Sequence, residues 1–307
     1  MKLIASPMVP LVSAENIRHR IMLRLLNETR KIFRQRIRRQ AIRLLPVYEI
    51  TDKQQPAIHM LVCRRDYEMA IISALVLNHL GRKGHFFILH DDGSLNHHIE
   101  NLFQKYLPGS VFIKRAIADK TAGQKLSDYP NLFRLRRENI LILKLTDIVL
   151  WAQSDRIGYM DSDILFFKYP LEYIQVLKTA SKTTFFNRDI ADAYISDKAI
   201  LKNIYNITLP ARINSGLWVT DKKYFDFGLI ESWLGHPFLK PYLSDYRLEQ
   251  TLFAMLAGMF NTEHFPSGYD VNFEKKPEIS TGKHYVGRIR YGYELEGLIY
   301  LISNKII

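Results

Sequence analysis

The chain has 307 residues, of which 47% are hydrophobic and 24% charged, so wholesale disorder and a fibrous repeat are excluded. A chain of this length can bury a sizeable core, and its single cysteine, Cys63, excludes an intrachain disulfide and any zinc cluster built on cysteines. The net charge of +12 is concentrated near the start, because residues 1–50 hold 11 Lys and Arg against 3 Asp and Glu. Basicity confined to one segment argues against a nucleic-acid partner for the whole chain.

Residues 16–45 have the pattern of a basic helix. Apolar residues recur there at four-residue spacing in two groups, Ile17, Ile21, Leu25 and Phe33, Ile37, Ala41. Arginines occupy many of the remaining positions, so residues 17–45 suit an anionic membrane surface. Two alternatives stay open: an extension packed on its own domain with a solvated arginine face, and a helix that docks on nucleic acid or protein.

The sequence also predicts where the protein resides. No run of about 18 apolar residues occurs, which argues against a spanning helix. Pro7 and Pro10 interrupt the apolar start, which makes it a poor signal peptide. We therefore expect a cytoplasmic protein, peripheral on the membrane if the basic helix binds lipid.

Beyond Pro56 short apolar runs alternate with helical segments. The expected strands are 57–63, 85–90, 111–114 and 156–160, and the expected helices are 68–80, 97–106 and 139–153. This alternation predicts an α/β domain at 56–307, with a mostly parallel sheet and flanking helices, after a basic helical extension and linker at 1–55. In such sheets ligands bind at the carboxyl ends of the strands.

One strand end carries two carboxylates. Asp161 and Asp163 follow the apolar strand 156–160 and precede another apolar run. Carboxylates are costly in apolar surroundings unless they are compensated, and Mg²⁺ or Mn²⁺ compensates such a pair. An ordinary polar turn between two strands is the alternative.

Three later segments also place polar residues among apolar ones. Asn214-Ser215-Gly216 combines hydrogen-bonding groups that suit a sugar with a glycine that allows close approach, although a plain turn or bulge would look the same. Glu249-Gln250 opens an apolar helix at 251–257, where helix capping is the alternative. His284, between glycines and basic residues, is a candidate metal ligand or a solvated loop histidine.

In this order along the chain, the four features resemble glycosyltransferases with the GT-A fold, above all glycosyltransferase family 8 and its relatives, over residues 57–290. The resemblance implies a metal site at Asp161, Asp163 and His284, the last within a His-Tyr-Val-Gly segment. It places Gln250 and Glu249 at the reacting carbon. The implied donor-binding residues are Asp66, Tyr67, Lys144, Asn214, Ser215, Gly216, Gly287 and Arg288.

The chain departs from the family at two places. Glu249 stands where the family has Asp, and Arg288 and Arg290 stand where it has a Lys-Pro-Trp segment. The implied reaction is the metal-dependent transfer of a hexose, with retention, from a nucleotide sugar, expected to be UDP-linked, to a hydroxyl of a saccharide or lipid-linked acceptor. Two other classes stay open: a metal-dependent phosphatase that uses the Asp-x-Asp, and a non-catalytic, degenerate transferase-like binding protein.

Overall fold

The structure is a computed structural model that describes residues 14–50 and 55–307, with the backbone alone described for 14–28 and for Arg288. Its centre is a seven-stranded sheet in the order β3-β2-β1-β4-β7-β6-β8. The strands of this sheet are β1 (Ile58–Val62), β2 (Phe87–Asp91), β3 (Val111–Ile113), β4 (Arg156–Met160), β6 (Thr184–Arg188), β7 (Ile213–Asp221) and β8 (Thr262–His264). A separate two-stranded sheet pairs β5 (Ile164–Phe166) with β9 (Gly282–His284).

The sheet is mostly parallel, as the alternation of strands and helices predicts. Strands β3, β2, β1 and β4 run parallel, and β6 pairs in parallel with β8. Strand β7 lies between β4 and β6 and is antiparallel to both. The α/β fold class expected from the sequence is confirmed, with β7 as the antiparallel exception.

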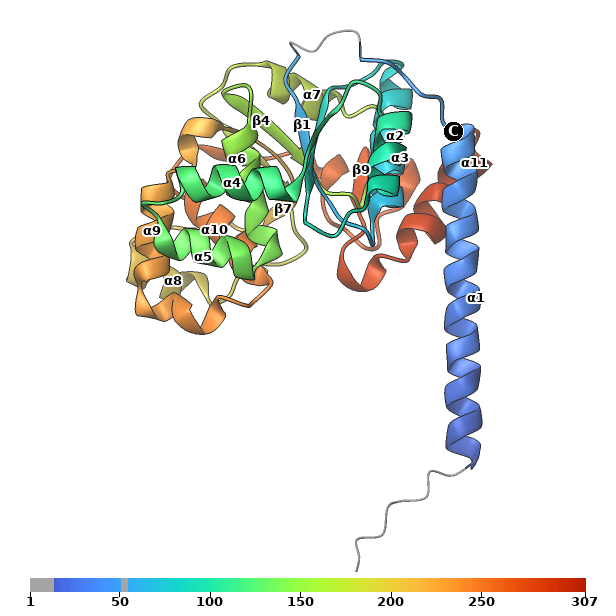
Figure 1. Ribbon diagram of the computed structural model, residues 1–307, viewed down its shortest axis with the longest axis horizontal. Coiled ribbons are helices and arrows are strands. Elements are labelled where there is room, and N and C mark those ends of the chain that lie inside the picture. Colours follow the sequence, from blue (N-terminus) through green and yellow to red (C-terminus); the bar gives the residue numbers. More distant parts are fainter. Residues whose placement is uncertain (1–13, 51–54) are drawn as a thin grey trace, which may run out of the picture.

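Helices cover both faces of the sheet (Figure 1). They are α2 (Tyr67–Gly81), α3 (His97–Tyr106), α4 (Arg115–Lys125), α5 (Pro130–Glu138), α6 (Asp147–Trp151), α7 (Leu171–Lys178), α8 (Lys198–Tyr205), α9 (Phe227–Gly235), α10 (Arg247–Ala257) and α11 (Ile299–Ser303). Strand residues alternate between two large core clusters, since Met160 packs in the one with α2 and α7 and Tyr159 in the one with α5 and α10. The sheet is therefore the middle of three layers.

Most expected elements lie within a few residues of their predicted bounds, but the expected helix at 139–153 is wrong. That segment is a short 3₁₀ helix, η1 (Ile140–Lys144), followed by a turn and α6. The Thr146 hydroxyl donates to the carbonyl of Ile142, and the Asp147 carboxylate pairs with the buried Arg136 guanidinium. These side-chain contacts replace continuous helical bonds and break the run in two.

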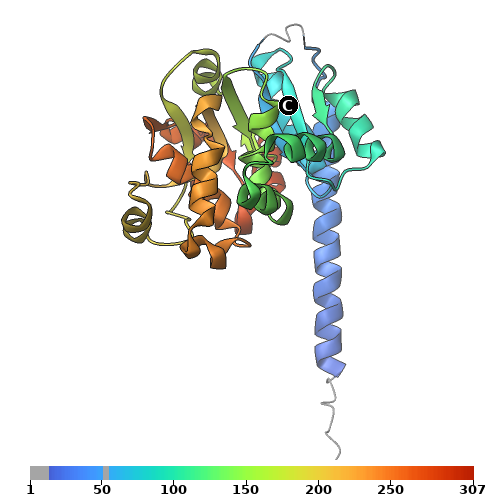
Figure 2. The same ribbon diagram turned by 60° about the vertical axis from the view of Figure 1, so that its left-hand side comes forward.

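Helix α1 (Ala14–Leu44) joins the domain at one end only. Ile37, Ala41 and Leu45 are buried in the same core cluster as α2, whereas Phe33, at the same spacing, is 52% exposed. The earlier part of the helix runs away from the domain in both views (Figures 1 and 2). Residues 1–13 and 51–54 of the predicted extension and linker lie outside the described residues. The division at 55/56 stays a prediction, but the last turns of α1 belong to the domain core.

Candidate metal and donor site

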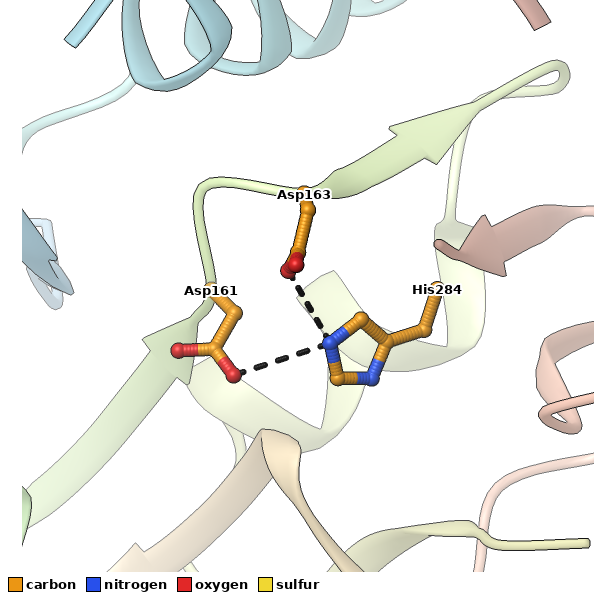
Figure 3. A group of neighbouring side chains, drawn as sticks. All are labelled: Asp161, Asp163 and His284. Carbon is orange, nitrogen blue, oxygen red and sulfur yellow. Dashed lines mark hydrogen bonds and ion pairs between the residues drawn. The ribbon is translucent and has the colours of Figure 1, made fainter. Parts of the chain in front are cut away.

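The two carboxylates and the distant histidine come together at one point. The candidate ligand atoms of Asp161, Asp163 and His284 all lie within 4.8 Å of one another. His284 Nε2 is 3.0 Å from Asp163 Oδ1 and 3.6 Å from Asp161 Oδ2, with the three side chains pointing inward (Figure 3). Oxygen and imidazole ligands in this arrangement suit a divalent metal.

Strand pairing explains how Asp163 and His284, 121 positions apart in the chain, become neighbours. β5 follows Asp163 directly, and its first residue, Ile164, pairs with His284 at the end of β9. The amide of Tyr285 donates to the Asp163 carbonyl at 2.9 Å and extends this pairing. His284 is therefore a buried strand residue and not the solvated loop histidine that the sequence left open.

Gly216 brings a third strand against the cluster. Its carbonyl accepts the Asp161 amide at 2.7 Å, which continues the β4–β7 pairing. The pairing register between β6 and β7 shifts here, so the segment 214–216 is a strand with a local irregularity. A Cβ on Gly216 would lie 2.2 Å from His284 Cε1, so only glycine fits.

Asn214 fixes which nitrogen of His284 carries a proton. Asn214 Oδ1 accepts the Gly216 amide at 3.0 Å and lies 3.0 Å from His284 Nδ1. Because Asn214 Oδ1 can only accept, Nδ1 must donate, which points the Nε2 lone pair of the neutral ring toward the carboxylates. Burial lowers the pKa of His284, but Asp163 and Asp161 outweigh it and raise the pKa above the usual value. The two carboxylates and the Nε2 atom that faces them are a donor set that fits a divalent ion.

Lys144 and Glu249 are two buried ionisable residues that lie next to each other beside Asp161. Lys144 Nζ donates to Asp161 Oδ2 at 3.0 Å and lies 3.7 Å from Glu249 Oε1. Burial raises the pKa of Glu249 to about 7, although Lys144 opposes that shift. Ser215 Oγ donates to Glu249 Oε2 at 2.9 Å, and the Tyr159 hydroxyl donates to Asp161 Oδ1. Each carboxylate oxygen of Asp161 therefore accepts a hydrogen bond, Oδ2 from Lys144 and Oδ1 from Tyr159.

Asp189, a residue that was not predicted from the sequence, connects Gln250 to this group. Its Oδ2 accepts from Asn214 Nδ2 at 2.9 Å and from Gln250 Nε2 at 3.2 Å. Gln250 Nε2 also lies 3.4 Å from the carbonyl of Ala193, so the amide protons of Gln250 point to the protein and its Oε1 points away from them. Asp189 follows the end of β6, and the strand-end rule would have found it had that strand been predicted.

A cleft of about 1030 Å³ opens beside the cluster. Asp161 and Asp163 line it together with Asp66 and Arg290. Arg290 Nη2 is 2.7 Å from Asp66 Oδ2 and 3.6 Å from Asp163 Oδ2, so this arginine lies between the start of α2 and the second carboxylate of the candidate metal site. Asp66 also pairs with Arg65 at 2.9 Å.

Two predicted donor contacts, Tyr67 and Gly287, lie outside this group. Tyr67 lines a separate hollow with Arg39 and Ile42 of α1, so its position gives no support to a nucleotide contact. Gly287 has a left-handed φ of +51° but is exposed, with space around it, and does not line the cleft. The side chain of Arg288 lies outside the described part of the chain.

Comparisons with known proteins give structural matches only. No protein-family model matches the chain, and no curated protein matches its sequence. The chain is similar to the apo form of mouse xyloside xylosyltransferase 1, with 12% identity and a TM-score of 0.47 over 70% of this chain and 86% of that one. It is similar to galactosyltransferase LgtC in complex with donor and acceptor sugar analogs, with 11% identity and a TM-score of 0.49 over 81% and 95%. It is also similar to the glycosyltransferase GlyE of Streptococcus pneumoniae TIGR4, with 12% identity and a TM-score of 0.47 over 82% and 64%.

The matched structures are glycosyltransferases, the class that the sequence motifs resemble. Likeness at these identities and scores does not bear on activity or substrate. The functional proposal therefore rests on the residues of this chain.

Proposed function

We propose that the protein is a metal-dependent glycosyltransferase that moves a hexose from a nucleotide sugar, with UDP as the expected nucleotide, to a hydroxyl acceptor with retention. The observation that carries the proposal is the convergence of Asp161, Asp163 and His284 beside a cleft with room for a nucleotide sugar. These three residues would hold Mn²⁺ or Mg²⁺. When bound, such an ion neutralises the charge that develops on a departing diphosphate.

The chain's own residues supply the other requirements. The reaction breaks the bond between C1 of the hexose and the diphosphate oxygen, and forms a bond from the acceptor hydroxyl oxygen to C1. With retention the hydroxyl attacks from the leaving-group side and its proton passes to the departing diphosphate. Gln250 can aim its amide oxygen at C1, where positive charge develops, because its amide protons face Asp189 and Ala193. Lys144 donates a hydrogen bond to Asp161 and so holds this carboxylate in place.

A second hollow, of about 320 Å³, suits the acceptor. Asp189 lines it and also contacts Gln250, so the hollow adjoins the proposed reacting carbon. Arg188, Arg212 and Phe273 also line it, so charged side chains and one aromatic ring are available to the hydroxyl groups and the apolar face of a saccharide. The hollow would accept a saccharide that is free or lipid-linked.

The projecting part of α1 is proposed as a contact with an anionic membrane surface. Ile32 and Phe33 are about half exposed beside Arg30 and Arg34, which is a pattern that anionic lipid attracts. No helix among the described residues is both long and apolar enough to cross a bilayer. Replacing Ile32 and Phe33 together with aspartate should weaken sedimentation with anionic vesicles at low salt, with neutral vesicles as the control. Equal sedimentation of both proteins would contradict the membrane contact.

The central test is a screen of nucleotide sugars for metal-dependent release of nucleoside diphosphate, with and without saccharide acceptors. Asp163→Asn keeps the side-chain shape but removes a charged ligand, so release should fall by at least about 100-fold while the thermal unfolding midpoint is retained. A non-catalytic binding protein would bind Mn²⁺ and a nucleoside diphosphate without releasing any from the sugar. Release of phosphate from phosphate monoesters, with no action on nucleotide sugars, would indicate the phosphatase.

A further inference from the structure

Helix α1 reaches the candidate cleft although it lies before the α/β domain in the sequence. Lys31 and Gln35 line the same cleft of about 1030 Å³ as Asp161 and Asp163. The cleft wall beyond the carboxyl end of β1 is therefore made partly by a segment that neither the sequence motifs nor the family resemblance assigns to the site.

The register and anchoring of α1 determine which residues face the cleft. Lys31, Gln35 and Arg38 follow each other at the four- and three-residue spacing that places side chains on one helical face. Arg38 Nε donates to the buried Glu294 carboxylate at 2.5 Å, and Arg38 Nη1 is 3.6 Å from Glu68 at the start of α2. Because Ile37 is buried in the core, the rotation of the helix about its axis is fixed. Lys31 and Gln35, on the same face as Arg38, therefore lie at the cleft.

The cations of the cleft differ in whether they are already paired. Arg65 and Arg290 form ion pairs with Asp66, and Lys144 forms one with Asp161. Lys31 and Arg64 also line the cleft, and neither makes an ion pair with any residue that the structure describes. Two cations are therefore available to a ligand with negative charge.

We infer that α1 forms one wall of the donor site and that Lys31 binds the diphosphate of the nucleotide sugar. The inference rests on the proposed function, since a nucleotide sugar with a neutral hexose carries its negative charge on the diphosphate. A lysine suits this task because its long stem carries a mobile point charge with three donors. Gln35, one turn further along the same face, supplies an amide to the same ligand.

The test compares two charge reversals on one helix. Lys31→Glu alters the cleft wall, whereas Arg36→Glu, at an exposed position that does not line the cleft, changes the net charge equally. Calorimetric titration with UDP and with GDP, each with Mn²⁺, should show affinity about tenfold weaker for Lys31→Glu and within about twofold of wild type for Arg36→Glu. Lys31→Arg should keep most of the affinity, and the loss in Lys31→Glu should shrink as salt is raised.

Each outcome separates the inference from the proposed function. Equal nucleotide affinities of wild type, Lys31→Glu and Arg36→Glu would overturn the role of Lys31 and leave the transferase intact. Loss of vesicle binding with unchanged nucleotide affinity would assign Lys31 to lipid, and would equally overturn it. If wild type binds Mn²⁺ but no nucleoside diphosphate, the proposed function fails, and the donor wall fails with it.

Discussion

Replacing Gly216 with alanine adds one methyl group where β7 passes the candidate metal ligands. The new Cβ would lie 2.2 Å from His284 Cε1, 2.7 Å from Nδ1 and 2.9 Å from Asp161 Oδ2. Ordinary contact begins at 3.4 Å, so the imidazole must move by about 1.2 Å. Metal ligands are held to within about 0.2 Å, so we expect Mn²⁺ affinity to fall by about 100-fold or more.

The same substitution should destabilise the fold only moderately. Gly216 is not among the described residues with positive φ, so alanine causes no backbone strain. Overpacking of a buried site costs about 1–3 kcal/mol, which a domain of this size survives. The metal site should therefore be lost from a protein that still folds.

Gly123→Ala is the matched control. A Cβ on Gly123, in α4, has nothing within 4 Å, and alanine stabilises a helix by about 0.5–1 kcal/mol over glycine. Mn²⁺ binding would be followed by the paramagnetic resonance signal of the free ion, and folding by thermal unfolding without metal. Wild-type Mn²⁺ affinity in Gly216→Ala would refute the close approach of β7 to His284.

The remaining predictions concern the histidine and a buried ion pair elsewhere. Asn214→Ala removes the acceptor that fixes the His284 tautomer, so Mn²⁺ affinity should fall about 10- to 100-fold without any donor present; unchanged affinity would restrict Asn214 to a sugar contact. Because the pKa of His284 is raised by Asp163, Mn²⁺ must displace a proton, and its apparent affinity should rise by up to about tenfold per pH unit until that pKa is passed. A calorimetric titration in buffers of different ionisation enthalpy would detect the released proton, and a flat pH profile would contradict the assignment. Asp147→Ala leaves the buried Arg136 guanidinium with only the half-exposed Asp119 as an ion-pair partner, and should lower the free energy of unfolding by about 2–3 kcal/mol with the Mn²⁺ affinity of the folded protein intact.

Local patterns in the sequence were enough to predict much of the sheet and one half of the metal site. The helix 97–106 and the strand 156–160 have the predicted bounds, because their apolar periodicity arises from which face each segment buries. Asp161 and Asp163 could be identified from the sequence alone, since they follow an apolar strand directly and ligands bind at such strand ends.

Tertiary structure decided the rest of the site. The neighbours of His284 depend on the β5–β9 pairing, and the role of Asn214 depends on an imidazole 70 residues away in the chain. Asp189 follows a strand that was not predicted, and Lys31 has no local signal that distinguishes it from the other cations of its helix. The pairing of distant strands and the docking of α1 depend on how all the buried surfaces fit together at once. A window of neighbouring residues contains no information on that fit. Local patterns therefore predict the strand ends, whereas the meeting of His284 with the two aspartates was expected only from the family resemblance.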